Sequence, residues 1–149
     1  MIGPEEQMLA AILSNLNFLS VLAAAVAAWL FGAVWYMALA KPWMAAQGWR
    51  GREDMPQKRG AAAAAPFIIS FVAELIMATM LFGIIQHIGE VNVRRALFSG
   101  FFIWLGFVAT TTTVNYAYPA RRPMLTVIDA GHWLGVLLVM GLVIGLFGA

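Results

Sequence analysis

Four apolar stretches dominate the sequence, over residues 17–40, 66–87, 95–118 and 124–147. Each has about the 20 residues that an α-helix needs to cross the hydrocarbon core of a bilayer. The composition agrees, because 62% of the residues are hydrophobic and only 11% are charged, whereas soluble domains carry roughly 25% charged residues. The sequence therefore predicts an all-α membrane protein, a four-transmembrane-helix bundle that forms a single integral membrane domain over residues 1–149.

Residues that favour helix ends border these stretches. Asn15 or Asn17 can cap the start of the first helix. Pro66 suits the first turn of the second helix, where its missing N–H leaves no hydrogen bond unmade. Three further signals mark the C-terminal ends of the first, second and third helices: Lys41-Pro42, Gly89 and Pro119.

The N-terminal residues leave two interpretations open. Residues 8–14 are apolar, and they either lengthen the first helix or form a short interfacial helix on the outer face. The first residues carry Glu5 and Glu6 where a signal peptide would be positively charged, so we expect the first hydrophobic segment to be retained.

The basic residues indicate an orientation in the membrane. Loop 41–60 holds five Lys and Arg residues and loop 118–123 holds two, whereas the opposite side has only Arg94 and Arg95. Because Lys and Arg concentrate in cytoplasmic loops, we expect both basic loops in the cytoplasm and both termini on the outer, periplasmic side of a bacterial inner membrane. Basic residues confined to loops and segment ends are typical of lipid-headgroup contacts, so the expected partner is the lipid bilayer and no nucleic acid is expected.

Aromatic and small residues predict contacts at the helix ends and between helices. Trp43 and Trp49 indicate a short interfacial segment of the first basic loop at headgroup level. Small residues at four-residue spacing let membrane helices approach closely. They lie in the first and fourth stretches, and the four glycines of the fourth fall within one helix face: Ala24, Ala28 and Gly32, then Gly131, Gly135, Gly141 and Gly145. We favour packing within one bundle, with a homo-oligomer as the alternative.

Glu74 lies in the middle of the second apolar stretch, with no Lys or Arg within a helical turn of it. A carboxylate inside hydrocarbon costs several kcal/mol unless a partner pairs with it or neutralises it. Such a residue belongs either to a polar cluster between helices or to a functional site.

Depth counts place further polar residues level with Glu74. At 1.5 Å per residue from the basic-loop end of each helix, Glu74, His132 and Thr111 all lie about 12 Å deep. A second group lies at roughly 6 to 9 Å by the same count: Asp129, Asn115, Tyr36 and Trp35. We take both groups together as the candidate site, although aromatic residues at a helix end are also typical of an aromatic belt.

Structural roles are open for the same residues. Glu74 and His132 could share a proton or form an ion pair. Glu74 could equally be a hydrogen-bond anchor between helices with no further role. Asp129 is shallow enough to reach the interface, and we favour its pairing there with Arg121 or Arg122 over a role in the site.

Motifs for catalysis or cofactor binding are absent from the sequence. It has no Walker A loop, no dinucleotide-binding glycine pattern, no H-E-x-x-H and no nucleophile elbow. The two histidines are expected at opposite ends of the membrane, and there is no cysteine, so neither a metal site nor a cofactor is predicted. An enzyme using Glu74 and His132 as acid and base is the least favoured reading because no nucleophile or metal set accompanies them.

Two segments carry a family resemblance. The first apolar stretch ends in Gly32-Ala-Val-Trp35-Tyr36 and is followed by Lys41-Pro-Trp43-Met44, and the fourth opens with Ile128-Asp129-Ala-Gly131. Together they resemble a family of small bacterial four-span membrane proteins catalogued as domain of unknown function number seventeen sixty-one. The resemblance covers nearly the whole chain and implies four helices, without implying an activity.

Two functions follow as hypotheses. In the first, the polar layer around Glu74 binds or transports a proton, a cation or a small polar solute. In the second, the protein is a structural or accessory subunit of a homo-oligomer or of a larger membrane complex, and it has no transport activity.

Overall fold

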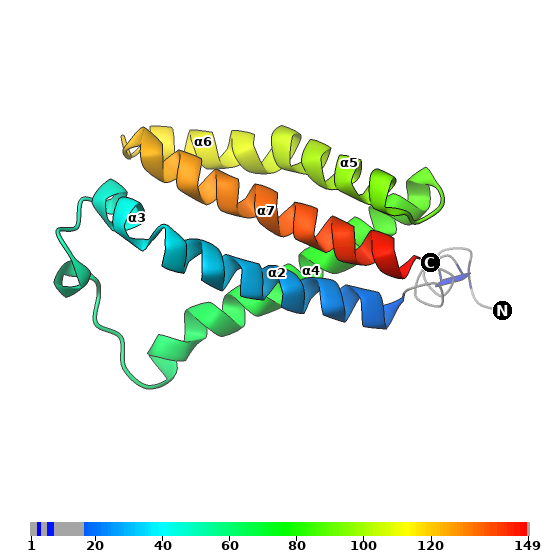
Figure 1. The fold of residues 1–149 in the computed structure, drawn as a ribbon, viewed down its shortest axis with the longest axis horizontal. Coiled ribbons are helices and arrows are strands. Elements are labelled where there is room, and N and C mark those ends of the chain that lie inside the picture. The colour runs from blue at the N-terminus through cyan, green and yellow to red at the C-terminus, as the bar shows by residue number, and fades with distance from the viewer. Residues whose placement is uncertain (1–2, 4–5, 8–16, 149) are drawn as a thin grey trace.

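The computed structural model describes Gly3, residues 6–7 and residues 17–148, so Asn15 and the apolar residues 8–14 lie outside the described part of the chain. It confirms an all-helical protein with four helices long and apolar enough to cross a membrane. These are α2 (Phe18–Ala38), α4 (Ala61–Ile88), the helix Val93–Ala117 and α7 (Pro123–Phe147). In Figure 1, α2 and α7 run side by side, and the described chain starts and ends at the same end of the bundle.

The first span ends earlier than the sequence predicts. Asn17 caps α2 as expected, because its side-chain oxygen accepts a hydrogen bond from the backbone N–H of Ser20 at 3.0 Å. The helix stops at Ala38, and after a turn at Leu39 a second helix, α3 (Ala40–Gln47), begins. Lys41-Pro42 marks this end as predicted, although the chain turns a few residues before it. Pro42 lies in the first turn of α3 and has no N–H to bond the carbonyl of Ala38, four residues earlier, where α2 stops.

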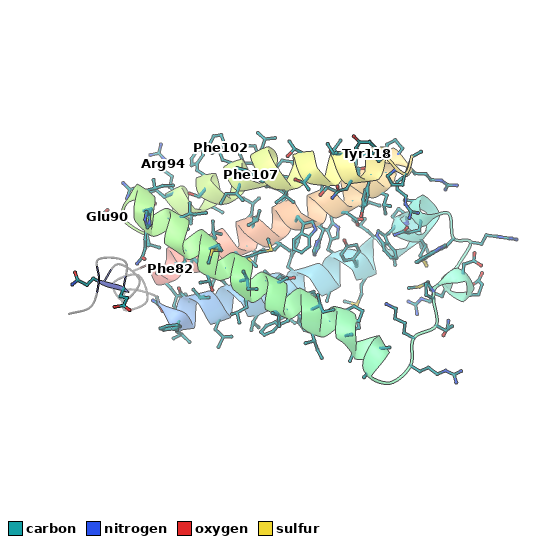
Figure 2. All side chains as sticks on the ribbon, turned by 180° about the vertical axis from the view of Figure 1, so that it is seen from behind. Phe82, Glu90, Arg94, Phe102, Phe107 and Tyr118 are labelled. Atoms are coloured by element: carbon teal, nitrogen blue, oxygen red, sulfur yellow. The ribbon has the colours of Figure 1, made fainter. Side chains whose placement is uncertain are left out.

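The second span begins earlier than predicted. Helix α4 starts at Ala61, so Pro66 lies inside the helix instead of in its first turn. The five alanines 61–65 explain the extension, since alanine has the highest helix propensity. These first turns are largely exposed and extend away from the other helices, while the rest of α4 crosses the bundle obliquely (Figures 1 and 2). Gly89 ends the helix, as predicted, with φ of 147°.

The third span is not one continuous α-helix. It consists of α5 (Val93–Ile103), a π-helical segment η2 (Trp104–Ala109) and α6 (Thr110–Ala117). A π turn holds one more residue than an α turn, so it rotates the residues that follow about the helix axis. The span ends two residues before Pro119, in agreement with the expected stop.

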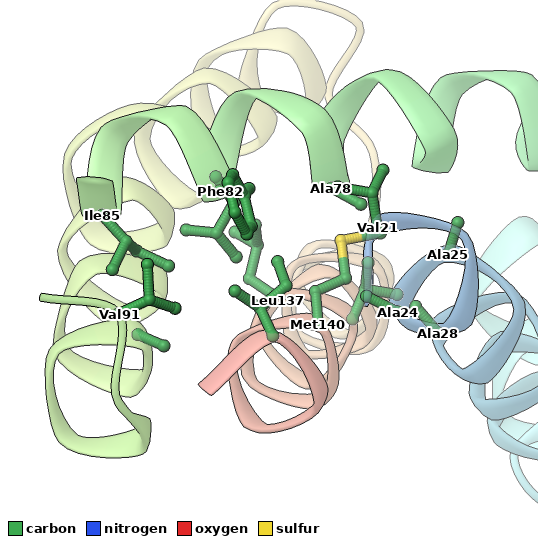
Figure 3. Close-up of a cluster of buried hydrophobic side chains, with 14 residues drawn as sticks. Val21, Ala24, Ala25, Ala28, Ala78, Phe82, Ile85, Val91, Leu137 and Met140 are labelled. Carbon is green, nitrogen blue, oxygen red and sulfur yellow. The ribbon is translucent and has the colours of Figure 1, made fainter. Parts of the chain in front are cut away.

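Helix α7 forms the centre of the bundle and packs against α2 on one side and α5 on the other. The core between these helices consists of buried alanines and larger aliphatic and aromatic side chains (Figure 3). Met140 of α7 has no exposed surface, and neither does Phe82 of α4. Among the described residues, the connection 48–60 contains a 3₁₀ turn, η1 (Arg52–Asp54), and the connections 89–92 and 118–122 are short.

The glycines of α7 bring it close to two different neighbours. A Cβ on Gly131 would lie 3.2 Å from the Trp35 ring of α2, and Gly135 faces Phe31 of the same helix. A Cβ on Gly141 would lie 2.8 Å from the backbone oxygen of Ala96 in α5, and Gly145 faces the backbone of the same helix. The four glycines therefore pack within the chain, Gly131 and Gly135 against α2 and Gly141 and Gly145 against α5.

Candidate functional site

Asp129 lies at the centre of a hydrogen-bond cluster near the end of the bundle that carries the basic loops. Its side chain is buried, and three side chains from three other elements donate hydrogen bonds to it. Tyr36 of α2 donates to Oδ1 at 2.9 Å and Trp43 of α3 donates to the same oxygen at 3.1 Å. Tyr116 of α6 donates to Oδ2 at 2.7 Å. We refer to these four residues as the Asp129 cluster.

Two indole groups fix the backbone of α7 on either side of Asp129. The Trp35 N–H donates to the carbonyl oxygen of Ile128 at 3.2 Å, and the Trp104 N–H donates to that of Ala130 at 2.7 Å. Both carbonyls lie inside α7 and can accept the helix's own i+4 bond, so the indoles add a second hydrogen bond from the elements on both sides of α7. The two contacts hold the Asp129 cluster in place from α2 and from the third span.

His132 lies one turn along α7 from Asp129 and is buried, with 5% of its surface exposed. Its ring packs against Tyr36, with centroids 4.8 Å apart, and against Trp133 at the same distance. Its Nε2 atom points at α2, where a Cβ on Gly32 would lie 2.7 Å from it. Its Nδ1 atom is buried and has no hydrogen-bond partner.

Glu74 is more deeply buried than Asp129, with 2% of its surface exposed. Ser70, one turn before it, accepts a hydrogen bond from the Trp29 indole at 3.1 Å, and Ala78, one turn after it, belongs to the same buried cluster as Ala25. Glu74 therefore faces the middle of α2. Its Oε2 atom is buried and has no hydrogen-bond partner.

A buried carboxylate oxygen and a buried imidazole nitrogen without partners are unusual, because most buried side-chain polar atoms are hydrogen-bonded. Both side chains face α2, Glu74 near its middle and His132 at Gly32. The structure describes no hydrogen bond or ion pair between them. The ion pair of Glu74 with His132, one of the roles left open by the sequence, is therefore not formed.

The comparison with protein families gives one match. Residues 19–145 match the family described as "Protein of unknown function (DUF1761)". The chain belongs to this family. No curated protein and no solved structure matches it. Membership in DUF1761 confirms the family resemblance, and together with the four candidate spans it indicates a multi-pass membrane protein.

Two predicted site residues of this DUF1761 member lie away from the cluster. Thr111 and Asn115 are both exposed on α6, one turn apart, and the structure describes no hydrogen bond for either side chain. The prediction that they join the polar layer inside the bundle is wrong. The depth count assumes a continuous α-helix. The π segment rotates the residues after Ala109 about the helix axis, so their side chains point in another direction.

The expected pairing of Asp129 with Arg121 or Arg122 is also wrong. Asp129 is buried, its described partners are the hydroxyl and indole groups of the cluster, and Arg122 donates instead to the carbonyl oxygen of Ala45 in α3. From the sequence alone, a carboxylate close to a basic loop can form an ion pair with a loop arginine or accept hydrogen bonds from buried side chains, and the sequence does not distinguish the two.

Tyr116 and Trp43 are the site residues that the sequence reasoning missed. Tyr116 follows the predicted Asn115 directly, and Trp43 was expected at headgroup level. Their chemistry gave a partial indication. Tyrosine and tryptophan both carry a donor that needs an acceptor when it is buried, and Asp129 is a carboxylate acceptor in the predicted layer. Among the described residues, no group of three or more His, Asp or Glu side chains is placed to hold a metal ion.

Proposed function

We propose that the protein binds a small polar species inside the membrane, a proton, a small cation or another small polar solute, and passes it between Glu74 and His132. The observation that carries the proposal is the pair of buried polar atoms without partners, Oε2 of Glu74 and Nδ1 of His132. Both atoms can take up or release a proton, and both can bond to a polar ligand.

The burial of Glu74 supports a role beyond packing. A buried polar group that gains no hydrogen bond destabilises the fold by about 1–3 kcal/mol, and one inside hydrocarbon finds no water to compensate. A packing role alone would be served by an apolar residue of similar size. Ionisable residues inside a membrane rarely face lipid. They usually face the bundle interior, where they mark the pathway of an ion or a solute.

The Asp129 cluster supports a route to this pair from the basic-loop end. Trp43 and Asp129 lie at that end, the Tyr36 hydroxyl bonds to Asp129, and the Tyr36 ring contacts His132. Polar groups thus follow one another from the end of the bundle to its interior. The Asp129 carboxylate already accepts three hydrogen bonds. The buried polar atoms without a partner lie further inside the bundle, on His132 and Glu74.

Infrared difference spectroscopy of the protein in lipid tests whether Glu74 takes up a proton. We expect a carboxyl band that titrates between about pH 4 and pH 10, the range that carboxyl and imidazole groups cover in proteins. The band should disappear in Glu74→Gln. The matched control is Glu90→Gln, which makes the same change at an exposed residue beyond the end of α4. A carboxyl of Glu74 that shows no titration over this range would contradict the proposal.

Flux measurements in liposomes test the passage of protons or cations. We expect the wild-type protein to collapse an imposed pH or potassium gradient, and Glu74→Gln and His132→Asn to abolish that flux. His87→Asn is the control for the histidine, because His87 is exposed and bonds only to the carbonyl of Gly83 in its own helix. Equal flux in wild type and Glu74→Gln would show that Glu74 takes no part in passage.

A second function, as an accessory subunit or homo-oligomer, is favoured by the third span. Only 6% of its most apolar stretch is buried inside the protein, against 28% to 39% of the corresponding stretches in the other three spans. Its exposed face carries Thr111 and Asn115, polar side chains that hydrogen-bond across helices in membrane bundles.

Cysteine cross-linking tests this second function directly, because the chain contains no cysteine of its own. Under it, Asn115→Cys forms disulfide dimers on oxidation in native membranes. Val127→Cys, on an exposed position of α7, is the control and should stay monomeric. Failure of Asn115→Cys to cross-link, with a monomeric particle after mild solubilisation, would count against the homo-oligomer.

For orientation, the proposal is that loops 41–60 and 118–123 face the cytoplasm of a bacterial inner membrane and both termini face outward. The excess of seven Lys and Arg over two supports it. Labelling of intact cells with an impermeant maleimide gives the test. Glu90→Cys should react, whereas Gln57→Cys should react only after the membrane is opened, and the reverse pattern would invert the orientation.

A further inference from the structure

A groove lies between α4 and α5 at the end of the bundle opposite the Asp129 cluster. Its volume is about 660 Å³, which falls within the roughly 300–1,000 Å³ typical of ligand sites. It is open to the outside, and its lining is mainly apolar, from the last turns of α4 and the first turns of α5: Ile84, Ile88, Phe98, Phe102 and Ile103, with Asn92, Arg94, Arg95 and Ser99.

Ser99 is the buried polar residue of this groove. It is 91% buried, since 9% of its surface is exposed, and it lines the groove. A serine within a helix usually donates its hydroxyl to a carbonyl one turn earlier. The structure describes no such bond for Ser99, so its hydroxyl is free to meet a ligand in the groove.

Two arginines without acidic partners lie at the mouth of the groove. Arg94 is exposed and lies over the Phe98 ring, with its guanidinium carbon 6.0 Å from the ring centroid (Figure 2 labels Arg94 and Phe102 on this side). Arg95 donates to the carbonyl oxygen of Glu90 at 3.0 Å, which uses one N–H of its guanidinium group. Among the described residues, neither arginine forms an ion pair with a carboxylate.

We infer that the groove binds an anionic phospholipid of the surrounding membrane, with its phosphate on Arg94 and Arg95 and an acyl chain along the apolar wall. Charge complementarity carries the assignment. Arginine forms strong, often bidentate hydrogen bonds with phosphate. The remaining lining is mainly apolar, Ile84, Ile88 and Phe102 among it, which suits an acyl chain and has no counterpart in a free phosphate ion.

Native mass spectrometry of the full-length protein, released from micelles doped with defined lipids, tests the assignment. We expect phosphatidylglycerol to be retained in preference to phosphatidylcholine. Arg94→Gln with Arg95→Gln should lower that retention by ~10-fold or more, because each replacement removes a charged hydrogen bond. Arg94→Gln alone should show part of the loss, and it leaves the fold intact because Arg94 makes no hydrogen bond in the structure.

One control and one further variant make the result specific. Arg50→Gln with Arg52→Gln removes the same charge from the exposed loop at the other end of the bundle and should leave retention unchanged. Ser99→Val should weaken phosphatidylglycerol binding by removing the hydroxyl and narrowing the groove.

Three outcomes would overturn the inference. Equal retention of both lipids, unaffected by Arg94→Gln, would mean that the groove does not distinguish the anionic headgroup from the zwitterionic one. An equal loss in the Arg50→Gln and Arg52→Gln control would mean non-specific charge attraction. Displacement of the lipid by inorganic phosphate at millimolar concentration would mean that the site takes a free anion.

Discussion

The Tyr116 hydroxyl donates to Oδ2 of Asp129 at 2.7 Å and so joins the end of the third span to the start of the fourth. The two residues are 13 positions apart, on either side of a short basic loop. Because the other oxygen of Asp129 accepts from α2 and α3, this bond completes a cluster to which three spans and α3 contribute. The cluster therefore holds the basic-loop end of the bundle together.

Replacing Tyr116 with phenylalanine removes one donor and keeps the ring. We expect the free energy of unfolding to fall by about 1.5–3 kcal/mol, the usual contribution of a hydrogen bond to a charged group. The measurement is SDS-induced unfolding in mixed micelles, followed by tryptophan fluorescence. Tyr118→Phe is the control, because 90% of Tyr118 is exposed. A loss that is the same in both variants would show that the hydroxyl bond to Asp129 contributes nothing.

Replacing Asp129 with asparagine should destabilise the protein more than Tyr116→Phe does. One carboxylate oxygen becomes an NH₂ group that faces hydroxyl or indole donors, so at least one buried donor loses its acceptor. We expect a loss above that of Tyr116→Phe, more than about 3 kcal/mol, in the same unfolding measurement. Asp54→Asn, in the exposed connection before α4, should stay within about 0.5 kcal/mol of wild type. An Asp129→Asn variant as stable as wild type would contradict a structural role for the cluster.

The π segment determines whether Tyr116 can reach Asp129. Deleting Gly106 removes one residue from it, which rotates α6 by about 100° relative to α5. We expect the deletion to break the Tyr116–Asp129 bond, so that Tyr116→Phe causes no further loss of stability in the deletion variant. Gly106→Ala keeps the chain length and should not lower the stability, since no atom lies within 4 Å of the added Cβ. Additive losses in the double variant would show that the bond survives without the π turn.

Much of the fold could be predicted from the sequence because long apolar runs and capping residues are local signals. Asn17 and Gly89 act at helix ends where the sequence places them. The turn at Leu39 follows from Pro42, which cannot bond to the carbonyl of Ala38. Helix α3 after that turn and the π segment around Gly106 were not predicted from the sequence. Each brings a tryptophan to α7, Trp43 to Asp129 and Trp104 to the carbonyl of Ala130, and contacts between helices are not visible in the pattern of one helix.

The candidate site was predicted in part for the same reason. Depth along a helix follows from residue number, so Tyr36 and Asp129 were correctly assigned to one layer and do bond to each other. The direction of a side chain around the helix depends on register, and the π turn changed that register for Thr111 and Asn115. Donors outside the apolar stretches, such as Trp43, could not be found from depth at all.

The close contact of α7 with α5 should depend on the absence of a side chain at Gly141. A Cβ there would lie 2.8 Å from the carbonyl oxygen of Ala96, a backbone atom that cannot move without separating the helices. We expect Gly141→Ala to lower the free energy of unfolding by about 1–3 kcal/mol, as overpacking does. Gly83→Ala is the matched control, because no atom lies within 4 Å of its added Cβ, and alanine gains about 0.5–1 kcal/mol over glycine within a helix. Unfolding in mixed micelles should therefore move in opposite directions for the two variants, and a stabilised Gly141→Ala would show that α5 and α7 are not in backbone contact at this position.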